Sequence, residues 1–492
     1  MTFFIRHQRI INWPGVVKAL GLLLMITGVL MAFCIPVALI FHETDIALAI
    51  AKSSAISFFC GLLMGIPGKM KKINLRIKEA YLIVSLSWII ISVFGTLPYL
   101  LSNTIPNFNL AFFETISGYT TTGASIINDI EALPKGILFW RSMTHWIGGI
   151  GIIVLFTAIM PLLGSSSMQL FSVETSSITI EKIHPHIKGT ALRLSFVYVI
   201  ITLLEIIFLR LGGMNIFDAV CHSFGTVATG GFSTQNTSIA EYSPYIQYVI
   251  MTFMLLAGIN FTLHYYFIKG KFKKTFSNNE LWFYFKTVGL SIVTLVVILM
   301  VKNPLLSLEH TFRDVSFQVI SVITCTGFIT TDYEVWPQIG WFIIFLLMFS
   351  GGMAGSTAGG IKSFRHLLLL RISRSEMQRR IHPNAIIPVR YNKTNVNSDT
   401  ILNVQAFFIF YIITFVIGTL LMVLAGLDLK SAAGGTASCL GGIGPGLGVV
   451  GAINNYANVY VFGMYVLSFI MLLGRLEIFT LLMIFTKSFW KQ

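Results

Sequence analysis

The stretch Phe112-Phe113-Glu114-Thr115-Ile116-Ser117-Gly118-Tyr119-Thr120-Thr121-Thr122-Gly123-Ala124-Ser125 decides how this chain folds. It predicts a short apolar helix that ends at a run of hydroxyl residues and a glycine, before a long apolar helix begins. Within a membrane, irregular backbone is tolerated only where it is buried in protein or lines a watery cavity. The carbonyl oxygens at this ending are therefore predicted to face a ligand, such as a cation that has lost its water.

Three later stretches resemble the first, over residues 224–233, 322–328 and 441–446. Each lies between two long apolar segments. Because the four stretches lie about 100 residues apart, they indicate an internal repeat. The predicted fold is an all-α integral membrane protein, in which four pseudo-repeated units of helix, pore loop and helix surround one central pore. Two further transmembrane helices precede the first unit.

The composition excludes a soluble domain, because 55% of the residues are hydrophobic and only 11% are charged. A net charge of +14 could suggest a nucleic-acid partner. The basic residues, however, gather in short loops between apolar segments, which is typical of the cytoplasmic side of membrane proteins. We therefore expect no nucleic acid. The five cysteines have no CxxC spacing and are expected to be buried thiols, without a disulfide framework or a zinc site.

The basic loops also predict the topology. They lie near residues 69–78, 182–188, 269–274 and 362–393, all on one side of the membrane. Ten spans with both termini in the cytoplasm satisfy this pattern. The chain then divides into two N-terminal helices with a basic loop and four pore repeats, at residues 1–79, 80–187, 188–280, 281–398 and 399–492. Since each repeat begins and ends inside, the repeats are parallel, unlike the inverted repeats of many alternating-access carriers.

The ion-binding candidates stand at the end of each pore helix. They are Thr121, Thr122 and Gly123; Ala228, Thr229 and Gly230; Cys325, Thr326 and Gly327; and Gly442, Ile443 and Gly444. The side chains differ between loops while the last glycine recurs, as expected if backbone carbonyls bind the ion. Glycine allows the positive φ that aims successive carbonyls inward. The alternative is four glycine-rich helix breaks that bind nothing.

Acidic residues flank these loops, namely Asp129, Glu131, Glu241, Asp332 and Glu334. They could concentrate cations at an outer mouth. The alternative is that they are solvated loop charges.

A glycine-rich segment over residues 350–361 interrupts the third inner helix. Each glycine there costs a helix about 1 kcal/mol relative to alanine. The segment therefore predicts a gate within the membrane, formed by Gly351, Gly352, Gly355, Ser356, Thr357, Gly359 and Gly360. The alternative is close helix packing through small residues.

Arg475 is predicted to lie deep in the last inner helix, roughly 12 residues or about 18 Å before Lys487. No arginine can snorkel that far, so Arg475 must face protein or a cavity. A fixed positive charge there would oppose cations beneath the filter. The alternative is a buried structural pair, for which Glu477 is a poor partner because it lies on another face of the same helix.

The basic stretch 362–393 follows from the positive-inside rule, and docking of a cytosolic regulatory protein or of anionic lipid is the alternative. Two other patterns are excluded as nucleotide sites. Residues 446–451 match GxGxxG but follow a pore loop and not a strand. Residues 355–363 resemble a P-loop, yet Ile361 separates its glycine from its lysine.

At these residues the sequence resembles the TrkH/TrkG family of bacterial potassium uptake proteins, in the superfamily that also contains KtrB and KdpA. The resemblance covers nearly the whole chain and rests on residues 120–124, 222–224 with 230–234, 351–362, 444–448 and 474–480. It implies potassium coordination at the four loops, a gating loop at 350–361 and a pore arginine at Arg475. It also implies a homodimer in the bacterial inner membrane, in contact with lipid. A TrkA-like cytosolic subunit would bind the regulatory nucleotides, with none bound by this chain.

Two features depart from the family pattern and bear on the preference for potassium over sodium. The second filter begins Ala228-Thr229, and residues 439–442 are unusually rich in glycine. The leading hypothesis is a gated, channel-like pore subunit for potassium uptake, and not an enzyme. The alternative is a proton- or sodium-coupled symporter that uses the same pore. Proton coupling needs titratable groups within the membrane, and the predicted spans offer few beyond Glu205, Arg475 and Glu477.

Overall fold

The computed structural model describes residues 11–66, 77–163, 187–303, 305, 307–392 and 394–490. Within these ranges the regular secondary structure is helical apart from one antiparallel pair of short strands, β1 (Arg390–Tyr391) and β2 (Thr394–Asn395). The basic residues predicted at 69–76 and 182–186 lie outside the described residues. The all-α prediction is confirmed.

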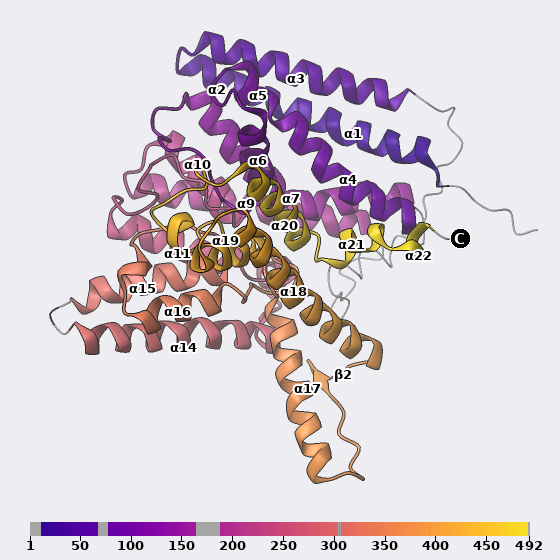
Figure 1. The fold of residues 1–492 in the computed structure, drawn as a ribbon, viewed down its shortest axis with the longest axis vertical. Coiled ribbons are helices and arrows are strands. Elements are labelled where there is room, and N and C mark those ends of the chain that lie inside the picture. Colours follow the sequence, from indigo (N-terminus) through magenta and orange to yellow (C-terminus); the bar gives the residue numbers. More distant parts are fainter. Residues whose placement is uncertain are drawn as a thin grey trace, which may run out of the picture.

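The N-terminal helices are α1 (Trp13–Ala32), α2 (Cys34–Ile40) and α3 (Thr44–Gly65). They lie along one side of the molecule (Figure 1). Glycines hold α1 and α3 close together, since a Cβ on Gly21 would lie 2.6 Å from the carbonyl oxygen of Gly61. Small residues at such a contact allow two backbones to approach without a layer of side chains between them.

Two units of similar plan follow. The first consists of α4 (Ile77–Gly95), α5 (Leu97–Leu101), α6 (Phe108–Tyr119) and α7 (Lys135–Leu163). The second consists of α9 (Ile187–Leu211), α10 (Ile216–Val227), α11 (Pro244–Ala257), α12 (Phe261–Ile268) and α13 (Phe272–Phe276). In each unit a short helix, α6 or α10, stands between two longer ones.

The third and fourth units repeat this plan. The third consists of α14 (Asn279–Lys302), α15 (Leu308–Ile323), the 3-10 turn η1 (Tyr333–Val335), α16 (Gln338–Leu347) and α17 (Ser363–Ile381). The fourth consists of α18 (Ser398–Leu424), α19 (Leu429–Gly441), η2 (Gly448–Val450), α20 (Val461–Arg475), α21 (Phe479–Leu482), η3 (Met483–Phe485) and α22 (Lys487–Trp490).

The four short helices share one starting signal, an N-cap side chain that accepts a hydrogen bond from the first turn. The caps are Asn107 with Asn109 N–H at 2.9 Å, Asn215 with Asp218 N–H at 2.8 Å, Ser307 with His310 N–H at 3.4 Å, and Asp428 with Ser431 N–H at 3.2 Å. This shared signal explains why α6, α10, α15 and α19 begin at matching places.

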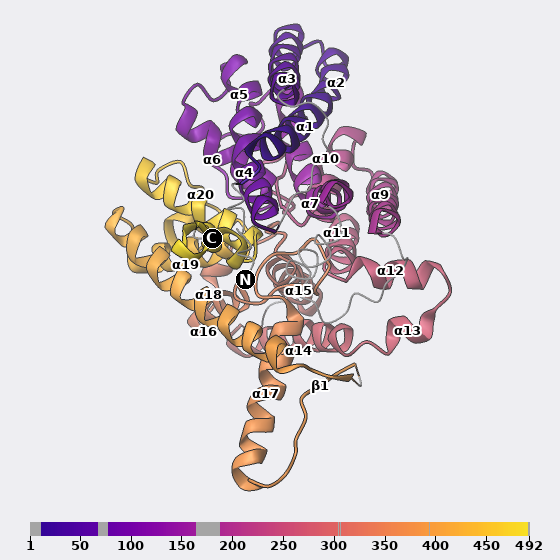
Figure 2. The same ribbon diagram turned by 90° about the vertical axis from the view of Figure 1, so that its right-hand side faces the viewer.

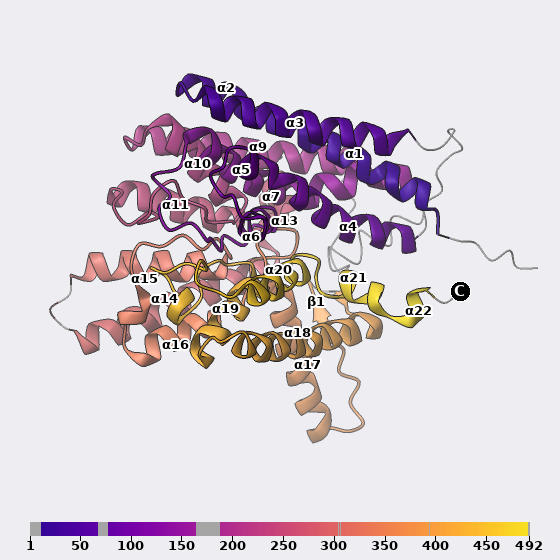
Figure 3. The ribbon, with the colours of Figure 1, turned by 45° about the horizontal axis from the view of Figure 1, so that its top comes forward.

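The four units surround a common centre in the order in which they occur along the chain (Figure 2). Their long helices run side by side (Figure 3). Helix α17 and the β1–β2 hairpin project from this body (Figures 1 and 2). The arrangement places the ends of the four short helices in the interior and leaves the long helices outside.

Six helices of the described ranges are long and apolar enough to cross a membrane, or up to eight if each bent pair counts as one span. The ten predicted spans also include α7, which is described only in part, and the interrupted third inner segment. The number ten therefore stays a prediction.

The prediction of continuous inner helices over 244–269 and 456–486 is wrong, because both helices are broken. Helices α11 and α12 meet at 101°, and α20 meets the segment that begins with α21 at 112°. Asn260 caps α12 by accepting a hydrogen bond from Thr262 N–H at 2.8 Å. At the second break Glu477 and Ile478 both have positive φ, 53° and 55°. The predicted interruption of the third inner segment is confirmed, since α16 and α17 are separate helices.

Candidate ion-binding site

All four short helices end in the same hydrogen-bonded turn. Each closes with a bond from a backbone N–H to the carbonyl five residues earlier, the pattern of a Schellman motif. The pairs are Thr122 to Ser117 at 2.9 Å, Gly230 to Gly225 at 2.8 Å, Thr326 to Ser321 at 2.8 Å and Ile443 to Ser438 at 2.9 Å. The four loops are therefore equivalent in backbone structure although their side chains differ.

Two left-handed residues, separated by one other residue, follow each helix. The first is Thr121 (φ 53°), Thr229 (55°), Cys325 (57°) or Gly442 (70°), and the second is Gly123 (81°), Gly231 (80°), Gly327 (81°) or Gly444 (102°). Positive φ is uncommon in residues other than glycine. Its presence at Thr121, Thr229 and Cys325 shows that the surrounding structure imposes this conformation on the loops.

These patterns correct one predicted equivalence. Gly231, and not Gly230, corresponds to Gly123, so the second candidate set is Thr229, Gly230 and Gly231. Ala228 occupies the place of Thr120 at the C-cap of its helix. The prediction was wrong by one residue because the glycine pair at 230–231 offers two alignments, and only the positive φ at Gly231 decides between them.

The four loops form a closed ring. The second left-handed glycine of each loop contacts the next loop. A Cβ atom built on this glycine would clash with a carbonyl oxygen of the next loop, namely that of the residue just before the second glycine there. The separations are 2.1 Å from Gly123 to Gly230 O, 2.0 Å from Gly231 to Thr326 O, 1.7 Å from Gly327 to Ile443 O and 2.7 Å from Gly444 to Thr122 O. The four glycines are thus close together, as predicted from their recurrence, and no side chain fits at any of them.

Most carbonyl groups in this ring have no protein hydrogen-bond donor. Gly444 O accepts a hydrogen bond from Tyr456 O–H at 2.7 Å. Ten others accept no hydrogen bond within the described ranges: those of Thr121, Thr122, Gly123, Thr229, Gly231, Cys325, Thr326, Gly327, Gly442 and Ile443. Buried backbone carbonyls are normally paired. In the same part of the chain, no group of three His, Cys, Asp or Glu side chains could hold a metal ion. The site therefore offers peptide oxygens, the ligands that suit a dehydrated monovalent cation.

The loops that follow the ring are also linked in sequence around the centre. Ile130 N–H donates to Asn236 Oδ1 (2.7 Å), Ile239 N–H to Ile329 O (3.0 Å), Tyr333 O–H to Gly446 O (2.6 Å) and Tyr456 N–H to Ser125 O (2.8 Å). Each loop is thereby fixed to its neighbour, so the positions of the four carbonyl sets depend on one another.

Three of the acidic residues predicted at the outer mouth serve these links. Asp129 accepts a hydrogen bond from the side-chain amide of Asn236 at 3.0 Å, which lowers the pKa of its carboxyl group. Glu131 accepts from the Asn236 backbone at 3.0 Å. Glu334 pairs with Lys430 and accepts from Gly448 N–H at 2.6 Å. Asp332 instead caps the turn η1 of its own loop by accepting from Glu334 N–H at 2.9 Å. Asp129, Glu131 and Glu334 thus bind neighbouring loops while they add negative charge to this side of the ring.

The glycine-rich segment 350–361 lies against the ends of three of the pore helices. Thr357 Oγ1 donates to Val227 O of α10 at 3.0 Å, and a Cβ on Gly359 would lie 2.2 Å from Gly441 O of α19. Ser350 O lies 3.9 Å from the sulfur of Cys325, which follows α15. The segment therefore crosses the molecule directly below the ring.

Arg475 joins this segment to the first unit. Its guanidinium donates to Thr357 O at 2.9 Å and to Gly148 O of α7 at 2.8 Å, and the residue is 7% exposed. The expectation that Arg475 faces protein within the molecule is confirmed. Both acceptors are backbone carbonyls, so its positive charge lies beside the segment below the ring.

Comparisons of the sequence and of the structure both relate this chain to known proteins. Residues 46–492 match the family profile of TrkH, described as a cation transport protein. This chain belongs to the TrkH family. The family consists of transport proteins and not of enzymes, and its multi-pass helical architecture fits the apolar helices described above.

Individual relatives of the TrkH family cover nearly the whole chain. The Trk system potassium uptake protein TrkH of Salmonella typhimurium is 35% identical over 486 residues, which cover 98% of this chain and all of the relative. The protein TrkG of Escherichia coli is 32% identical, with 86% of this chain and 88% of the relative covered. The crystal structure of the potassium transporter TrkH from Vibrio parahaemolyticus matches with a TM-score of 0.88 at 34% identity, covering 98% of this chain and all of that chain.

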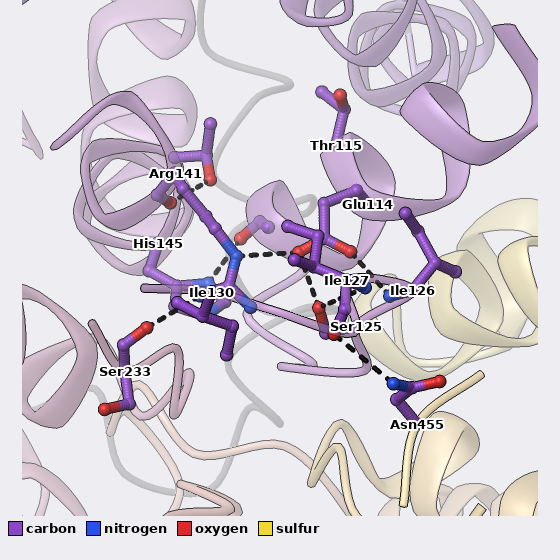
Figure 4. Close-up of polar contacts among 12 residues, drawn as sticks. Glu114, Thr115, Ser125, Ile126, Ile127, Ile130, Arg141, His145, Ser233 and Asn455 are labelled. Atoms are coloured by element: carbon purple, nitrogen blue, oxygen red, sulfur yellow. Dashed lines mark hydrogen bonds and ion pairs between the residues drawn. The ribbon is translucent and has the colours of Figure 1, made fainter. Parts of the chain in front are cut away.

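In this TrkH-family chain a buried ion pair supports the first loop of the ring. Arg141 Nε of α7 lies 2.7 Å from Glu114 Oε1 of α6, and the two side chains are 2% and 0% exposed (Figure 4). Glu114 also accepts hydrogen bonds from Ser125 O–H at 3.0 Å and from Ile126 N–H at 2.9 Å. The carboxylate thus fixes the segment that leaves Gly123 to the helix that leads into it.

The same arginine reaches the second loop. Its Nη1 donates to Ser233 O at 2.9 Å, and its guanidinium lies 3.5 Å from the ring centroid of Phe232. His145, one turn further along α7, also stacks on Phe232, with the two ring centroids 4.0 Å apart, and its Nδ1 lies 2.8 Å from Gly118 O. The sequence reasoning missed Arg141 and His145, although charged or titratable side chains in an apolar helix were the available signal.

Glu477 is not the partner of Arg475. It forms an ion pair with Arg365 of α17, whose guanidinium also lies 3.7 Å from the ring centroid of Phe407. The prediction that Glu477 is a poor partner for Arg475 is confirmed, although the two residues do not share a helix, since α20 ends at Arg475. The pair connects the break after α20 to the first turn of α17, next to the glycine-rich segment.

Proposed function

We propose that this protein is the ion-translocating subunit of a potassium uptake system, with the ring of four loops as its selectivity filter. The observation that carries the proposal is the contact of each second glycine with a carbonyl of the next loop. A ring closed in this way places peptide oxygens from four sides around one axis. Potassium is the substrate, and its hydration shell would be replaced by these oxygens.

The proposed filter residues are Thr121, Thr122 and Gly123; Thr229, Gly230 and Gly231; Cys325, Thr326 and Gly327; and Gly442, Ile443 and Gly444. The relatives named above are potassium uptake proteins and a potassium transporter, which supports potassium as the ion. The ten carbonyls without donors supply ligands that would otherwise stay unpaired. Hydroxyl groups add rigidity, since Thr120 and Thr122 are 2.8 Å apart, as are Thr324 and Thr326.

We propose the segment 350–361 and Arg475 as a gate below this filter. The segment passes under the ring, and its backbone accepts a hydrogen bond from Arg475. Five glycines leave it with few side chains to anchor it, so modest forces can displace it. A positive charge at this depth also disfavours cations until the segment and Arg475 move.

The assembly is proposed as a homodimer in the bacterial inner membrane, in contact with lipid and with both termini in the cytoplasm. Large apolar side chains are exposed along the outer helices, among them Leu203, Ile207, Leu290, Val297 and Leu420. Such surfaces need lipid or a second copy to cover them. A TrkA-like cytosolic subunit is the proposed regulator, and the basic helix α17, which projects from the body, is its proposed contact.

Flux measurements on the purified protein test this function. The protein would be reconstituted into liposomes, and potassium and sodium flux measured with and without an imposed proton gradient. We expect potassium flux to exceed sodium flux and to need no proton gradient. Equal flux of both ions would reject the filter, while potassium movement that requires the gradient would favour a coupled symporter.

A further inference from the structure

A buried carboxylate joins the proposed gate to the projecting part of the third unit. Glu280, the second residue of α14, is 1% exposed. Its Oε1 accepts hydrogen bonds from Ala354 N–H at 2.7 Å and from Phe364 N–H at 3.1 Å. Its Oε2 accepts one from the hydroxyl group of Tyr391 at 3.0 Å. The two oxygens thus serve two different parts of the chain.

The Oε1 contacts hold the glycine-rich segment. Ala354 lies in the middle of that segment, and Phe364 lies in the first turn of the helix that follows it. Other contacts hold the segment from the side of α11 and α12. Met353 N–H donates to Gly258 O at 2.8 Å, and Phe261 N–H donates to Gly355 O at 3.1 Å. Glu280 is the side chain of α14 that binds the backbone of the segment.

The Oε2 contact reaches the β1–β2 hairpin. Tyr391 ends β1 and is 1% exposed. The next residue, Asn392, accepts a hydrogen bond from Asn279 N–H at 2.8 Å, so two consecutive hairpin residues bind the start of α14. The hairpin is also tied to α17, because Arg371 donates to Arg390 O. A movement of α17 and the hairpin would therefore act on Tyr391.

The hydrogen bond from Tyr391 has a large effect on Glu280 because both residues are buried. A carboxylate that loses a hydrogen-bond donor in a site closed to water retains the cost of its desolvation. Withdrawal of Tyr391 would leave Oε2 unpaired and favour rearrangement of Glu280. Ala354 and Phe364 would then lose the acceptor that keeps their backbone in place.

We propose that Glu280 is a positioning residue that transmits movement of the β1–β2 hairpin to the segment 350–361 through its hydrogen bond with Tyr391. The inference rests on the proposed gate, and it adds the link between that gate and the surface from which it is controlled. In the arrangement described here, the hydroxyl group of Tyr391 stabilises the segment below the filter.

Tyr391→Phe tests the link with little risk to folding, because it keeps the buried ring and removes the hydroxyl group. Glu280→Gln is the second variant. The chain offers a matched control pair, Tyr248 and Glu309, in which a tyrosine hydroxyl group donates to a carboxylate at 3.3 Å in the first turn of α15. Tyr248→Phe and Glu309→Gln therefore remove the same chemistry away from the segment.

Two measurements are made on the full-length protein. In hydrogen–deuterium exchange, the amides of 350–361 should exchange about tenfold faster in Tyr391→Phe and in Glu280→Gln, as expected for loss of one hydrogen bond that holds the segment. In liposomes both should raise potassium flux several-fold, with the ratio of potassium to sodium flux unchanged. The control variants should match the wild type in both measurements.

The outcomes separate this inference from the proposed function. Unchanged exchange over 350–361 in Tyr391→Phe overturns the link, whatever the flux. Faster exchange with unchanged flux supports the link and rejects the segment as the gate. Lower flux with uniformly faster exchange means that the two residues only stabilise the fold, and this too overturns the inference.

Discussion

Single atoms decide the geometry of the ring, and Gly231 shows how. A methyl group at this position would lie 2.0 Å from Thr326 O, and φ is +80°, a conformation that side chains disfavour. Either the clash with Thr326 O or the unfavourable φ would by itself distort the loop. Together they mean that Thr326 and Gly231 could not both keep their places in the ring.

Gly231→Ala should therefore lower the preference for potassium over sodium by about tenfold or more, because the carbonyl of Thr326 must move away from the axis. The measurement is the flux ratio of the two ions in liposomes. Gly289→Ala is the matched control, since no atom lies within 4 Å of a Cβ there and the residue is within helix α14. A wild-type flux ratio in Gly231→Ala would mean that this loop takes no part in selection.

At the scale of residues, the sequence predicts which residues form the loops better than it predicts the geometry of those residues. The recurrence of glycine after each pore helix identified three of the four ring glycines, and at the pair 230–231 it led to Gly230 in place of Gly231. Glu114 lies within residues 112–125, the stretch that decides the fold, yet the neighbouring residues do not indicate that it binds Arg141. Glu280 likewise has no local signal, because its partners lie more than 70 residues away in the chain.

Between elements, the pair of Glu114 and Arg141 is the contact with the largest expected energetic effect. Removing one partner of a buried pair leaves the other charge uncompensated in a site closed to water. Glu114→Gln should lower the free energy of unfolding by about 3 kcal/mol or more. Denaturant unfolding in detergent measures this change.

Glu376→Gln is the control for that variant. Glu376 pairs with Arg379 at 3.5 Å, with both side chains about half exposed, and loss of such a pair should change stability by less than about 1 kcal/mol. Glu114→Gln should also lower the ratio of potassium to sodium flux, because the carboxylate holds the segment after Gly123. Equal stability of the two variants would show that the buried pair does not support the filter.

The segment 350–361 makes a second prediction at the scale of elements. Deleting residues 353–358 removes Thr357, the residue through which Arg475 and α10 hold the segment. Potassium flux should rise, since neither the segment nor its contact with Arg475 would remain below the filter. The measurement is the initial rate of uptake into liposomes at equal protein content. An unaltered rate would count against a gate at this place.

Hydropathy and glycine content predicted most elements, because long apolar runs and helix-breaking clusters are local properties. They failed at the breaks after α11 and α20. Only one glycine, Gly258, marks the first break, and the second occurs at Leu476-Glu477-Ile478, residues that favour helix. The positive φ of Glu477 and Ile478 is imposed by tertiary contacts, among them the ion pair of Glu477 with Arg365. Such contacts are invisible in a single sequence.

For the molecule as a whole, the question is whether ion flow is coupled to protons. A proton relay needs titratable groups in succession across the membrane. In the described part of the chain Glu114 and Glu280 are each held by hydrogen bonds, and Glu205 of α9 is completely buried beside the hydroxyl group of Thr226. We expect Glu205 to take no part in a relay, because one buried carboxylate beside a threonine hydroxyl group does not form a succession of titratable groups.

Potassium flux in Glu205→Gln should consequently equal that of the wild type, with or without a proton gradient. The comparison uses liposomes of fixed internal pH and an imposed external pH. Glu309→Gln, at an exposed carboxylate, serves as the control. Gradient-driven accumulation that the wild type shows and Glu205→Gln lacks would indicate a coupled carrier.

The order in which the four units contact one another around the ring is also a property of the whole molecule. Regular spacing along the chain predicted four similar loops, and parallel repeats are consistent with a ring. The order of contacts could not be predicted, because it depends on which neighbour each loop meets in space. The same limit explains why the acidic residues after the loops were expected to attract ions, while most of them also bind the adjacent loop.

The most direct test of the ring as an ion site is to locate a bound ion. Crystals of the protein grown with thallium or rubidium in place of potassium would give anomalous scattering at the ion. We predict a peak on the axis of the ring, in contact with the carbonyl oxygens of Thr122, Gly230, Thr326 and Ile443. A map with no peak there, or with ions only beside acidic side chains at the loops, would contradict the account.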